Sequence, residues 1–329
     1  MGTAQSGLTA RPTGAGVLIV RNPSSGKDVI RRDPAAVIAE RMPDAIVHEL
    51  ADDEKLDDAV AQALAAAEPP AVLGVLGGDG SVSRMAHLAR RHGMPLLVLP
   101  GGTFNHFARA VGVDSVEVAL DALAAGTGVS VTVAEVSADG ADPVTVLNAT
   151  SLGTYPQVVA EREDRMDDFG KWLGGLVATW RALRETTPVT IERNGRRARV
   201  WSVFVSVGRN APDQVATMQR QTIDDAVLDI RIHHARGSRL RAVASLAFGR
   251  KSTAFLRALR VMPKSSDLER ILVPDLELRV TPAPGAPSVY VHDGELEEAA
   301  TGGWTLRCAI VPDALEVYAP TPAPAELAG

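Results

Sequence analysis

The sequence predicts an α/β N-terminal domain with a parallel sheet, joined to a β-rich antiparallel C-terminal sandwich domain. Up to Gly126, short apolar runs alternate with helix-compatible stretches, which is the pattern of βαβ units. After Gly126, runs of β-branched residues follow one another with turn residues between them. The length of 329 residues suits about two domains. We therefore expect domains at residues 1–126 and 127–319 and a flexible Pro/Ala-rich tail at 320–329.

The first domain follows a polar leader. Strands are predicted at residues 16–20, 45–50, 72–76 and 95–99, and the first of them is expected to be buried. Helices are predicted between and after them, at residues 33–41, 52–67, 82–91, 105–110 and 115–125. Two glycine turns, Gly77–Gly80 and Pro100–Thr103, directly follow the third and fourth strands. Open α/β sheets bind ligands at the carboxyl ends of their strands, so both turns are candidate ligand contacts.

The second domain is predicted to be mostly antiparallel β-structure. Its strands are expected at residues 129–136, 144–148, 199–207, 227–233, 276–281, 289–291 and 304–311. Two helical segments are expected to interrupt them, at about 156–186 and 238–261.

Composition limits the classes of function. A net charge of −6 argues against a nucleic-acid partner, because such binding needs a basic surface. No window approaches the ~18–20 uninterrupted apolar residues that span a bilayer, and the start of the chain lacks a signal-peptide apolar region. The cytosol is therefore the expected compartment. Cys308, the single cysteine, lies in a strand-like run and is expected to fill the core rather than act as a nucleophile.

The first glycine turn, Gly77-Gly-Asp-Gly80, is the most informative motif. Its glycines allow close approach of the backbone to a bulky anion and allow positive φ. The N–H groups at the start of the following helix favour phosphate. A loop that only holds phosphate gains nothing from the carboxylate of Asp79, which suits a metal ligand or a proton acceptor. The alternative is a plain glycine turn in which Asp79 caps the helix.

Two further loops follow strands of the first domain. In Pro100–Arg109, Gly101 and Gly102 permit a tight approach, and Asn105 can cap the next helix or bind a ligand amide. Two glycine loops on adjacent strands can enclose one triphosphate between them. The run Asn22-Pro-Ser-Ser-Gly-Lys27 is not a P-loop, because it lacks the first glycine and the Ser or Thr after the lysine. It can still contact phosphate.

Carboxylates also gather in the second half of the chain. Asp293 and Glu295 lie two residues apart after a strand, and an extended backbone would place both on one face. Such a pair suits proton abstraction or metal binding, but Asp-Gly is also a common hairpin turn. The run Ile223–Asp229 holds three carboxylates and is either a cation site or a solvated turn.

Together these pieces resemble the diacylglycerol kinase catalytic-domain family, which includes bacterial lipid kinases and sphingosine and ceramide kinases and is distantly related to NAD kinases. The resemblance covers roughly residues 16–318. The motifs that carry it, in order, are Asn22-Pro-Ser-Ser-Gly26, Gly77-Gly-Asp-Gly-Ser81, Pro100-Gly-Gly-Thr-Phe-Asn-His-Phe-Ala-Arg109 and Asp293-Gly-Glu295. Leu147–Pro156 is also similar to the start of the family's second domain.

The resemblance implies a nucleotide-binding kinase domain over residues 1–126, a β-rich substrate domain over 127–319, and ATP bound in the cleft between them. It implies Asp293 and Glu295 as the proton acceptor and its support. Asp79 also qualifies as a catalytic carboxylate; we favour Glu295 or Asp293 as the base, with Asp79 close to the metal and the phosphates. The resemblance implies nucleotide contacts at Asn22, Pro23, Ser25, Gly26, Gly77, Gly78, Asp79, Gly80, Ser81, Val82, Ser83, Gly102, Thr103 and Asn105.

The resemblance also implies a structural Mg²⁺, held by Asp225 and by the backbone carbonyls of Thr222 and Val227. The sequence departs from the family pattern at three positions. Ser81 replaces a usual Thr, His106 stands where many members have Asp, and Ala226 replaces the usual Gly after the metal-site Asp. The last change places the magnesium site in doubt.

A basic segment outside the motifs favours a lipid substrate. Residues 231–264 carry nine Lys or Arg and no Asp or Glu, with apolar residues at roughly helical spacing. A basic amphipathic helix suits an anionic membrane surface, although a helix packed on the β-domain with a solvated basic face is the alternative.

We expect an ATP- and Mg²⁺-dependent lipid kinase that acts on a diacylglycerol-like or sphingoid hydroxyl at the inner face of the membrane. A homodimer is a candidate assembly. The alternatives are an NAD or other small-molecule kinase, and a lipid- or nucleotide-binding protein that has lost catalysis.

Overall fold

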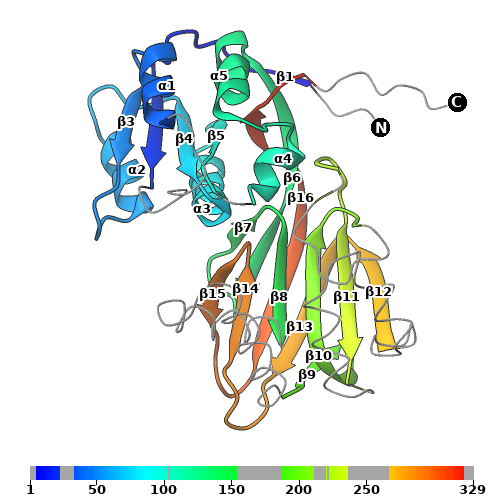
Figure 1. Cartoon of the computed structure of the whole chain (residues 1–329). Coiled ribbons are helices and arrows are strands. Elements are labelled where there is room, and N and C mark those ends of the chain that lie inside the picture. Colours follow the sequence, from blue (N-terminus) through cyan, green and yellow to red (C-terminus); the bar gives the residue numbers. More distant parts are fainter. Residues whose placement is uncertain are drawn as a thin grey trace, which may run out of the picture. The chain divides into compact units, whose positions relative to one another are not determined.

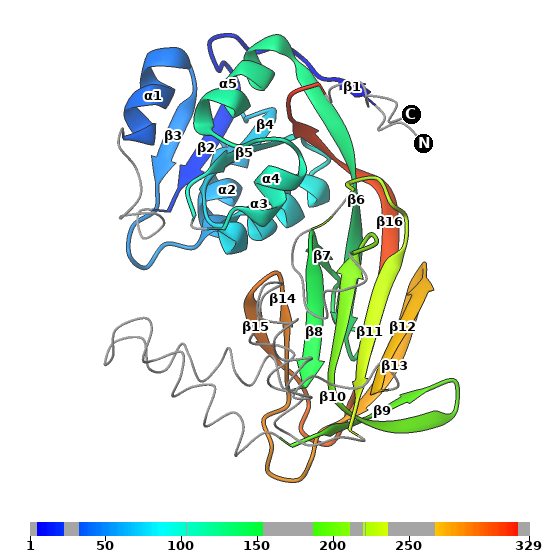
Figure 2. The ribbon, with the colours of Figure 1, turned by 45° about the vertical axis from the view of Figure 1, so that its right-hand side comes forward.

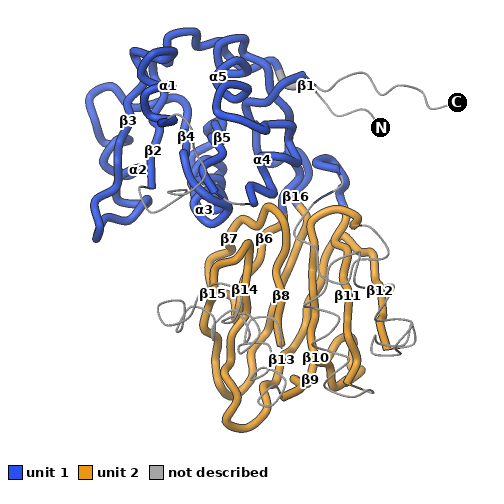
Figure 3. The backbone as a smooth tube through the Cα atoms, viewed as in Figure 1, with its two compact units in different colours: residues 1–133, 219–226, 311–329 blue, residues 134–218, 227–310 orange. Residues whose placement is uncertain are grey.

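The computed structural model describes residues 5–22, 33–102, 104–153, 187–210, 220, 222–235 and 267–321. The chain divides into two compact units, coloured separately in Figure 3. Unit 1 consists of residues 1–133, 219–226 and 311–329, and unit 2 of residues 134–218 and 227–310. The predicted helical segments at 156–186 and 238–261 lie outside the described residues. The predicted domain boundary after residue 126 stays a prediction.

Unit 1 contains the predicted parallel sheet (Figure 1). Its strands are β2 (Val17–Arg21), β3 (Ile46–Glu49), β4 (Val72–Gly77) and β5 (Leu96–Pro100), in the order β3-β2-β4-β5. Every pair is parallel. The strands β2, β4 and β5 form near-continuous buried apolar runs, as expected for strands covered on both faces.

Five helices accompany this sheet: α1 (Pro34–Arg41), α2 (Leu56–Leu64), α3 (Asp79–Arg91), α4 (His106–Ala110) and α5 (Val116–Ala125). The chain moves from β2 outward to β3, then crosses back over β2 to reach β4. Because such crossovers are right-handed, this reversal places α1 and α2 on opposite faces of the sheet. In agreement, α1 contacts α5 whereas α2 contacts α3 (Figure 2). The reversal makes the β2–β4 boundary a topological switch point.

Two helices of unit 1 differ from their predicted bounds. The helix predicted at 52–67 begins only at Leu56, because a turn precedes it in which the Glu54 N–H donates to the Ala51 carbonyl and the Glu54 carboxylate accepts from the Ala51 N–H. In contrast, α3 begins at Asp79 rather than at residue 82, so part of the glycine turn is already helical.

Unit 2 is antiparallel. Its strands are β7 (Val144–Val146), β8 (Ala149–Gly153), β9 (Val189–Arg193), β10 (Arg196–Val207), β11 (Leu228–His234), β12 (Leu268–Val273), β13 (Asp275–Thr281), β14 (Val289–His292) and β15 (Glu295–Glu298). Two longer strands, β6 (Thr127–Ala138) and β16 (Trp304–Tyr318), have residues in both units. The order is β15-β14-β8-β10-β9-β13-β16, with β11 on β10 and β12 on β11. The short strand β1 (Gln5–Gly7) pairs with β6 in unit 1.

One hydrophobic cluster takes residues from most strands of unit 2, so the hydrogen-bonded sheet must fold over a shared core, as in the predicted sandwich. Strand β13 shows the alternation clearly: Leu276, Leu278 and Val280 are buried and their neighbours are exposed. Cys308 lies in this core, where burial raises the pKa of its thiol to about 12. The fold class is thus confirmed. Among the described residues, no helix is both long and apolar enough to cross a bilayer.

The strand predicted at 304–311 is longer than expected. Although Pro312 cannot donate to a ladder and Asp313 has a φ of 47°, β16 continues to Tyr318. Its end joins the parallel sheet of unit 1, where Val317 pairs with Leu96.

Candidate functional site

Three of the predicted loops follow neighbouring strands of unit 1. Arg21 of β2 lies opposite Leu76 of β4, and Gly77 of β4 lies opposite Pro100 of β5. The Asn22 N–H donates to the Leu76 carbonyl at 3.3 Å. The loop after β2 and the two glycine turns therefore start at one carboxyl edge of the sheet, beside the switch point at which such sheets bind ligands.

The two glycine turns touch each other through their backbones. A Cβ atom on Gly102 would lie 2.6 Å from the Cα of Gly78, and the Gly101 N–H donates to the Gly77 carbonyl at 2.9 Å. A Cβ atom on Gly77 would lie 2.9 Å from the Cβ of Ser81. No glycine of these turns has a positive φ, which corrects the sequence expectation. Their glycines serve close approach rather than a left-handed backbone.

The start of α3 presents backbone donors at this edge. Gly78 is the N-cap, and the N–H groups of residues 79–81 have no partner within the helix. The Val82 N–H already donates to the Gly78 carbonyl, and the side chains of Val82 and Ser83 are buried. Residues 79–81 are thus the part of the predicted phosphate contact that can donate to an anion.

Asp79 lies in the first turn of α3, where the helix dipole favours a carboxylate. It does not cap its own helix, because the N-cap is Gly78. Instead, its carboxylate accepts a long hydrogen bond of 3.5 Å from the N–H of Phe107 in α4. Asp79 is half-buried, so the carboxylate keeps access to solvent and to a ligand.

Asn105 stabilises the second glycine turn. Its φ of 50° is left-handed, which Asn tolerates better than most residues. Its side-chain oxygen accepts from the Gly102 N–H at 2.9 Å, and its amide NH₂ donates to the Gly102 carbonyl at 2.8 Å. The side chain therefore does not cap the helix. While these two bonds are formed, it also does not make the ligand contact that the sequence suggested. Pro23, Ser25, Gly26 and Thr103 lie outside the described residues.

In unit 2, Asp293 forms a hairpin turn with Gly294 between β14 and β15. The side chain is 2% exposed. Its carboxylate accepts three backbone N–H groups, from Leu147 at 2.6 Å, Asn148 at 2.8 Å and Ala149 at 3.1 Å. These bonds link the hairpin to the segment that leads into β8. Asp293 is thus a fully engaged hydrogen-bond acceptor in this structure.

Glu295 is placed quite differently. It is the first residue of β15, lies opposite His292 across the hairpin, and is exposed. Of the two alternatives that the sequence left open, the structure has the hairpin, because the left-handed Asp293 (φ 46°) and Gly294 (φ 97°) turn the chain before Glu295. Of the two carboxylates, Glu295 is the one that a reactant in solution can reach.

The residues implied for a structural magnesium do not form a ready site. Thr222 and Asp225 belong to unit 1 and Val227 to unit 2. The Thr222 carbonyl accepts from the guanidinium of Arg220 at 3.3 Å, and the Val227 carbonyl accepts from the Gly208 N–H at 2.8 Å. Sequence reasoning missed Arg220, since a single arginine beside an acidic run has no motif to mark it. A guanidinium on one proposed ligand does not fit a Mg²⁺ ion there.

One basic residue of the segment at 231–264, Arg231, is buried in the structure. Arg231 is 8% exposed in β11 and donates to the buried carboxylate of Asp229 at 3.2 Å. Arg270 of β12 donates to the same carboxylate at 2.7 Å. Arg231 is therefore part of a core ion pair rather than of a membrane-facing surface. The other basic residues of the segment, at 236–264, lie outside the described residues.

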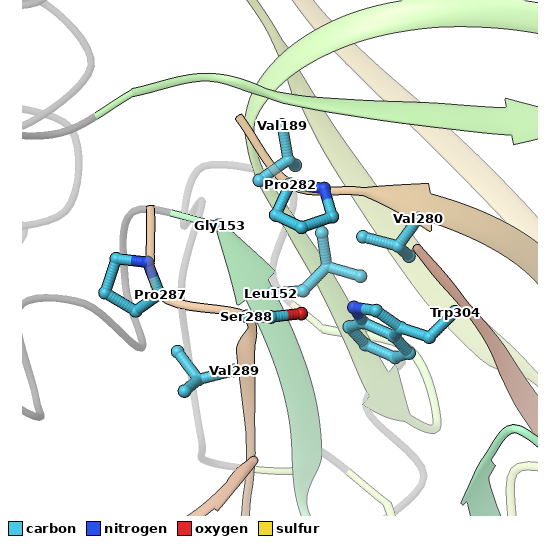
Figure 4. A pocket seen from close by; sticks show the side chains of 9 residues that line it. All are labelled: Leu152, Gly153, Val189, Val280, Pro282, Pro287, Ser288, Val289 and Trp304. Atoms are coloured by element: carbon cyan, nitrogen blue, oxygen red, sulfur yellow. The ribbon is translucent and has the colours of Figure 1, made fainter. Parts of the chain in front are cut away.

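Two cavities lie away from this edge. The one in Figure 4, lined in unit 2 by Leu152 and Trp304 among others, has a volume of about 10 Å³. That is room for roughly one water molecule and not for an acyl chain. A larger cavity of about 190 Å³ lies in unit 1 against Pro95, at the opposite end of β5 from the glycine turns. Neither belongs to the site described above.

Comparison with known proteins gives one family-model match, which lies in the first part of the chain. The family model of the diacylglycerol kinase catalytic domain matches residues 16–136. None of the curated proteins matches the sequence significantly.

Solved structures from Bacillus anthracis strain Sterne share the fold. A candidate diacylglycerol kinase is 18% identical with a TM-score of 0.59, over 96% of this chain and 100% of its own. Another structure, described as a diacylglycerol kinase, is 18% identical with a TM-score of 0.56, over 92% of this chain and 96% of its own.

Proposed function

We propose that this chain, whose residues 16–136 match the diacylglycerol kinase catalytic domain, is an ATP-dependent lipid kinase. It transfers the γ-phosphate of ATP to the hydroxyl of a diacylglycerol-like or sphingoid lipid. The observation that carries this proposal is the backbone contact of Gly78 with Gly102, which joins two glycine turns into one surface beside the start of α3.

The nucleotide side of the reaction needs charge neutralisation and alignment more than covalent chemistry. In the proposal, the N–H groups of residues 79–81 hold phosphate oxygens, and the positive end of the α3 dipole favours their charge. The Asp79 carboxylate, half-buried beside these donors, would hold the magnesium that accompanies ATP. That ion would offset phosphate charge during transfer.

The acceptor side needs a base, because a primary alcohol does not ionise at neutral pH. Asp293 already accepts three backbone N–H groups and is buried, so it is poorly suited to take a proton. We assign the proton acceptor to the exposed Glu295. Asp293 is then a positioning residue, which fixes the hairpin that presents Glu295.

The lipid nature of the acceptor rests on the family match and on the charge of residues 236–264. Eight Lys or Arg remain in this stretch once the buried Arg231 is set aside, and there is no acidic residue. Each basic residue near an anionic bilayer contributes about 1 kcal/mol to binding. The proposal therefore places the protein in the cytosol and peripherally at the inner face of the membrane.

A direct test uses labelled ATP with separate substrates: diacylglycerol in micelles, a sphingoid base in micelles, and NAD in solution. The proposal expects label in a lipid product, with Asp79→Asn and Glu295→Gln both reducing transfer. Label in NAD alone would favour the small-molecule kinase instead. Nucleotide binding without any transfer would favour a protein that has lost catalysis.

A further inference from the structure

Arg220 is a buried cation in a turn of unit 1. Arg220 is only 5% exposed, although arginine is rarely buried unless its charge is compensated. Its Nε donates to the Thr222 carbonyl at 3.3 Å, and a terminal guanidinium nitrogen donates to the Ile223 carbonyl at 3.0 Å. The Ile223 carbonyl also accepts from the N–H of Thr132 in β6 at 2.9 Å. Arg220 thus gathers backbone oxygens in the way that a bound cation would.

One of these oxygens, the Thr222 carbonyl, belongs to the ligand set that the family resemblance implies for a structural Mg²⁺. Magnesium takes oxygen ligands in near-ideal octahedral geometry at about 2.0–2.1 Å. A guanidinium that donates to the Thr222 carbonyl competes for that oxygen and repels a second cation beside it. Arginine keeps its charge at every physiological pH, so this repulsion cannot be relieved by deprotonation.

The neighbouring residues of the turn also disfavour a magnesium ion. Asp225 is the single carboxylate of the implied ligand set, and Ala226 follows it in place of glycine. Among the described residues, no group of three or more His, Cys, Asp or Glu side chains could hold a metal ion.

We propose that the guanidinium of Arg220 takes the place of the structural metal in this protein. The turn at residues 222–225 is then held by a side chain of the chain itself, and folding does not require Mg²⁺. This inference does not depend on the kinase proposal, because it concerns the protein without nucleotide or lipid.

The test is thermal unfolding of the full chain without nucleotide, in EDTA and in millimolar MgCl₂, together with the magnesium content of the dialysed protein. The proposal expects the same melting temperature in both buffers and no stoichiometric Mg²⁺. Arg220→Met is expected to melt several degrees lower, because the buried carbonyls lose their charged donor. Arg307→Met is the matched control, since Arg307 is exposed and pairs with Glu277 only at the surface.

Several outcomes would overturn the proposal. One is a wild-type melting temperature that rises with Mg²⁺ and returns to the EDTA value in Asp225→Asn. Another is one tightly bound Mg²⁺ per chain, and a third is an Arg220→Met variant as stable as wild type. If Arg220→Met does not fold, the metal content and the EDTA comparison on wild-type protein still decide the question. Kinase activity is not a suitable readout, because Mg²⁺ is also needed by ATP.

Discussion

A side chain on Gly102 would collide with Gly78: its Cβ would lie 2.6 Å from the Gly78 Cα, a separation that real Cβ atoms essentially never show. The obstacle is backbone, so no rotamer change can relieve it. Since the two residues follow different strands of the parallel sheet, their contact fixes the spacing of two turns that the sequence alone could only assign to neighbouring strands.

Gly102→Ala should therefore separate the two turns. We expect a loss of about 1–3 kcal/mol in the free energy of unfolding, as for other overpacked sites, and a clear fall in ATP affinity. Urea unfolding and nucleotide titration would measure the two effects. Gly7→Ala is the control, because a Cβ there meets nothing within 4 Å and Gly7 has no positive φ. An unchanged ATP affinity in Gly102→Ala would argue against the two-turn site.

The parallel half of the fold was largely readable from the sequence. The runs that became β2, β4 and β5 are short, apolar and bounded by Gly, Pro or Asn, which is typical of strands buried on both faces. The errors in this half were in the ends of the elements. For example, α2 begins later than predicted because a local turn at Ala51–Glu54 competes with the helix. The predicted strand at 304–311 ended before Pro312, because proline normally ends a strand. In the structure β16 continues past this proline.

The antiparallel half was less readable. Strands β1, β8, β9, β12 and β15 were not predicted. Strands β1, β8 and β12 pair with strands that lie far away in sequence, whereas β9 and β15 are short strands that form hairpins with their neighbours β10 and β14. The candidate site shows the same limit. That the loops of unit 1 start at one edge follows from parallel pairing. The burial of Asp293 depends on N–H groups of residues 147–149, almost half the chain away, and no local pattern encodes that.

Asp293→Asn tests whether this carboxylate is structural. The amide NH₂ would face backbone N–H donors, so at least one buried hydrogen bond would be lost. We expect about 2–4 kcal/mol of destabilisation in urea unfolding, since hydrogen bonds to charged groups are among the stronger ones. A variant with unchanged stability and abolished transfer would instead identify Asp293 as the base.

Glu295→Gln should have the opposite effect, with unchanged stability and reduced activity. Because Glu295 is exposed, the variant should unfold at the same urea concentration as wild type. If Glu295 takes the proton of the acceptor hydroxyl, kcat should fall by about 10²–10⁴-fold with little change in ATP affinity. Glu298→Gln, also exposed on β15, is the matched control and should keep full activity. Equal activity of the two variants would exclude Glu295 as the base.

Binding to anionic vesicles tests the membrane role of residues 236–264. Replacing Arg257 and Arg260 by Gln should weaken binding to phosphatidylserine-containing vesicles by about 2 kcal/mol, roughly thirtyfold, at ~1 kcal/mol for each residue. Raising the salt concentration should weaken wild-type binding as well. Sedimentation with vesicles measures both. Arg307→Gln is the exposed control outside the segment. Binding that does not depend on salt or on lipid charge would argue against a membrane role for this segment.

Stability should depend on pH through His233. Burial lowers the pKa of this imidazole from 6.5 to about 4, with Asp267 opposing and His234 adding to the shift. The unfolded state then binds more protons between these values. The free energy of unfolding should therefore fall as pH drops from about 6.5 to 4, by at most ~3 kcal/mol. His233→Leu should flatten much of this slope, although His87, whose pKa burial and then Arg84 also lower, would keep part of it. The exposed His92→Gln should leave the slope unchanged, and a His233→Leu variant with the full wild-type slope would contradict the assignment.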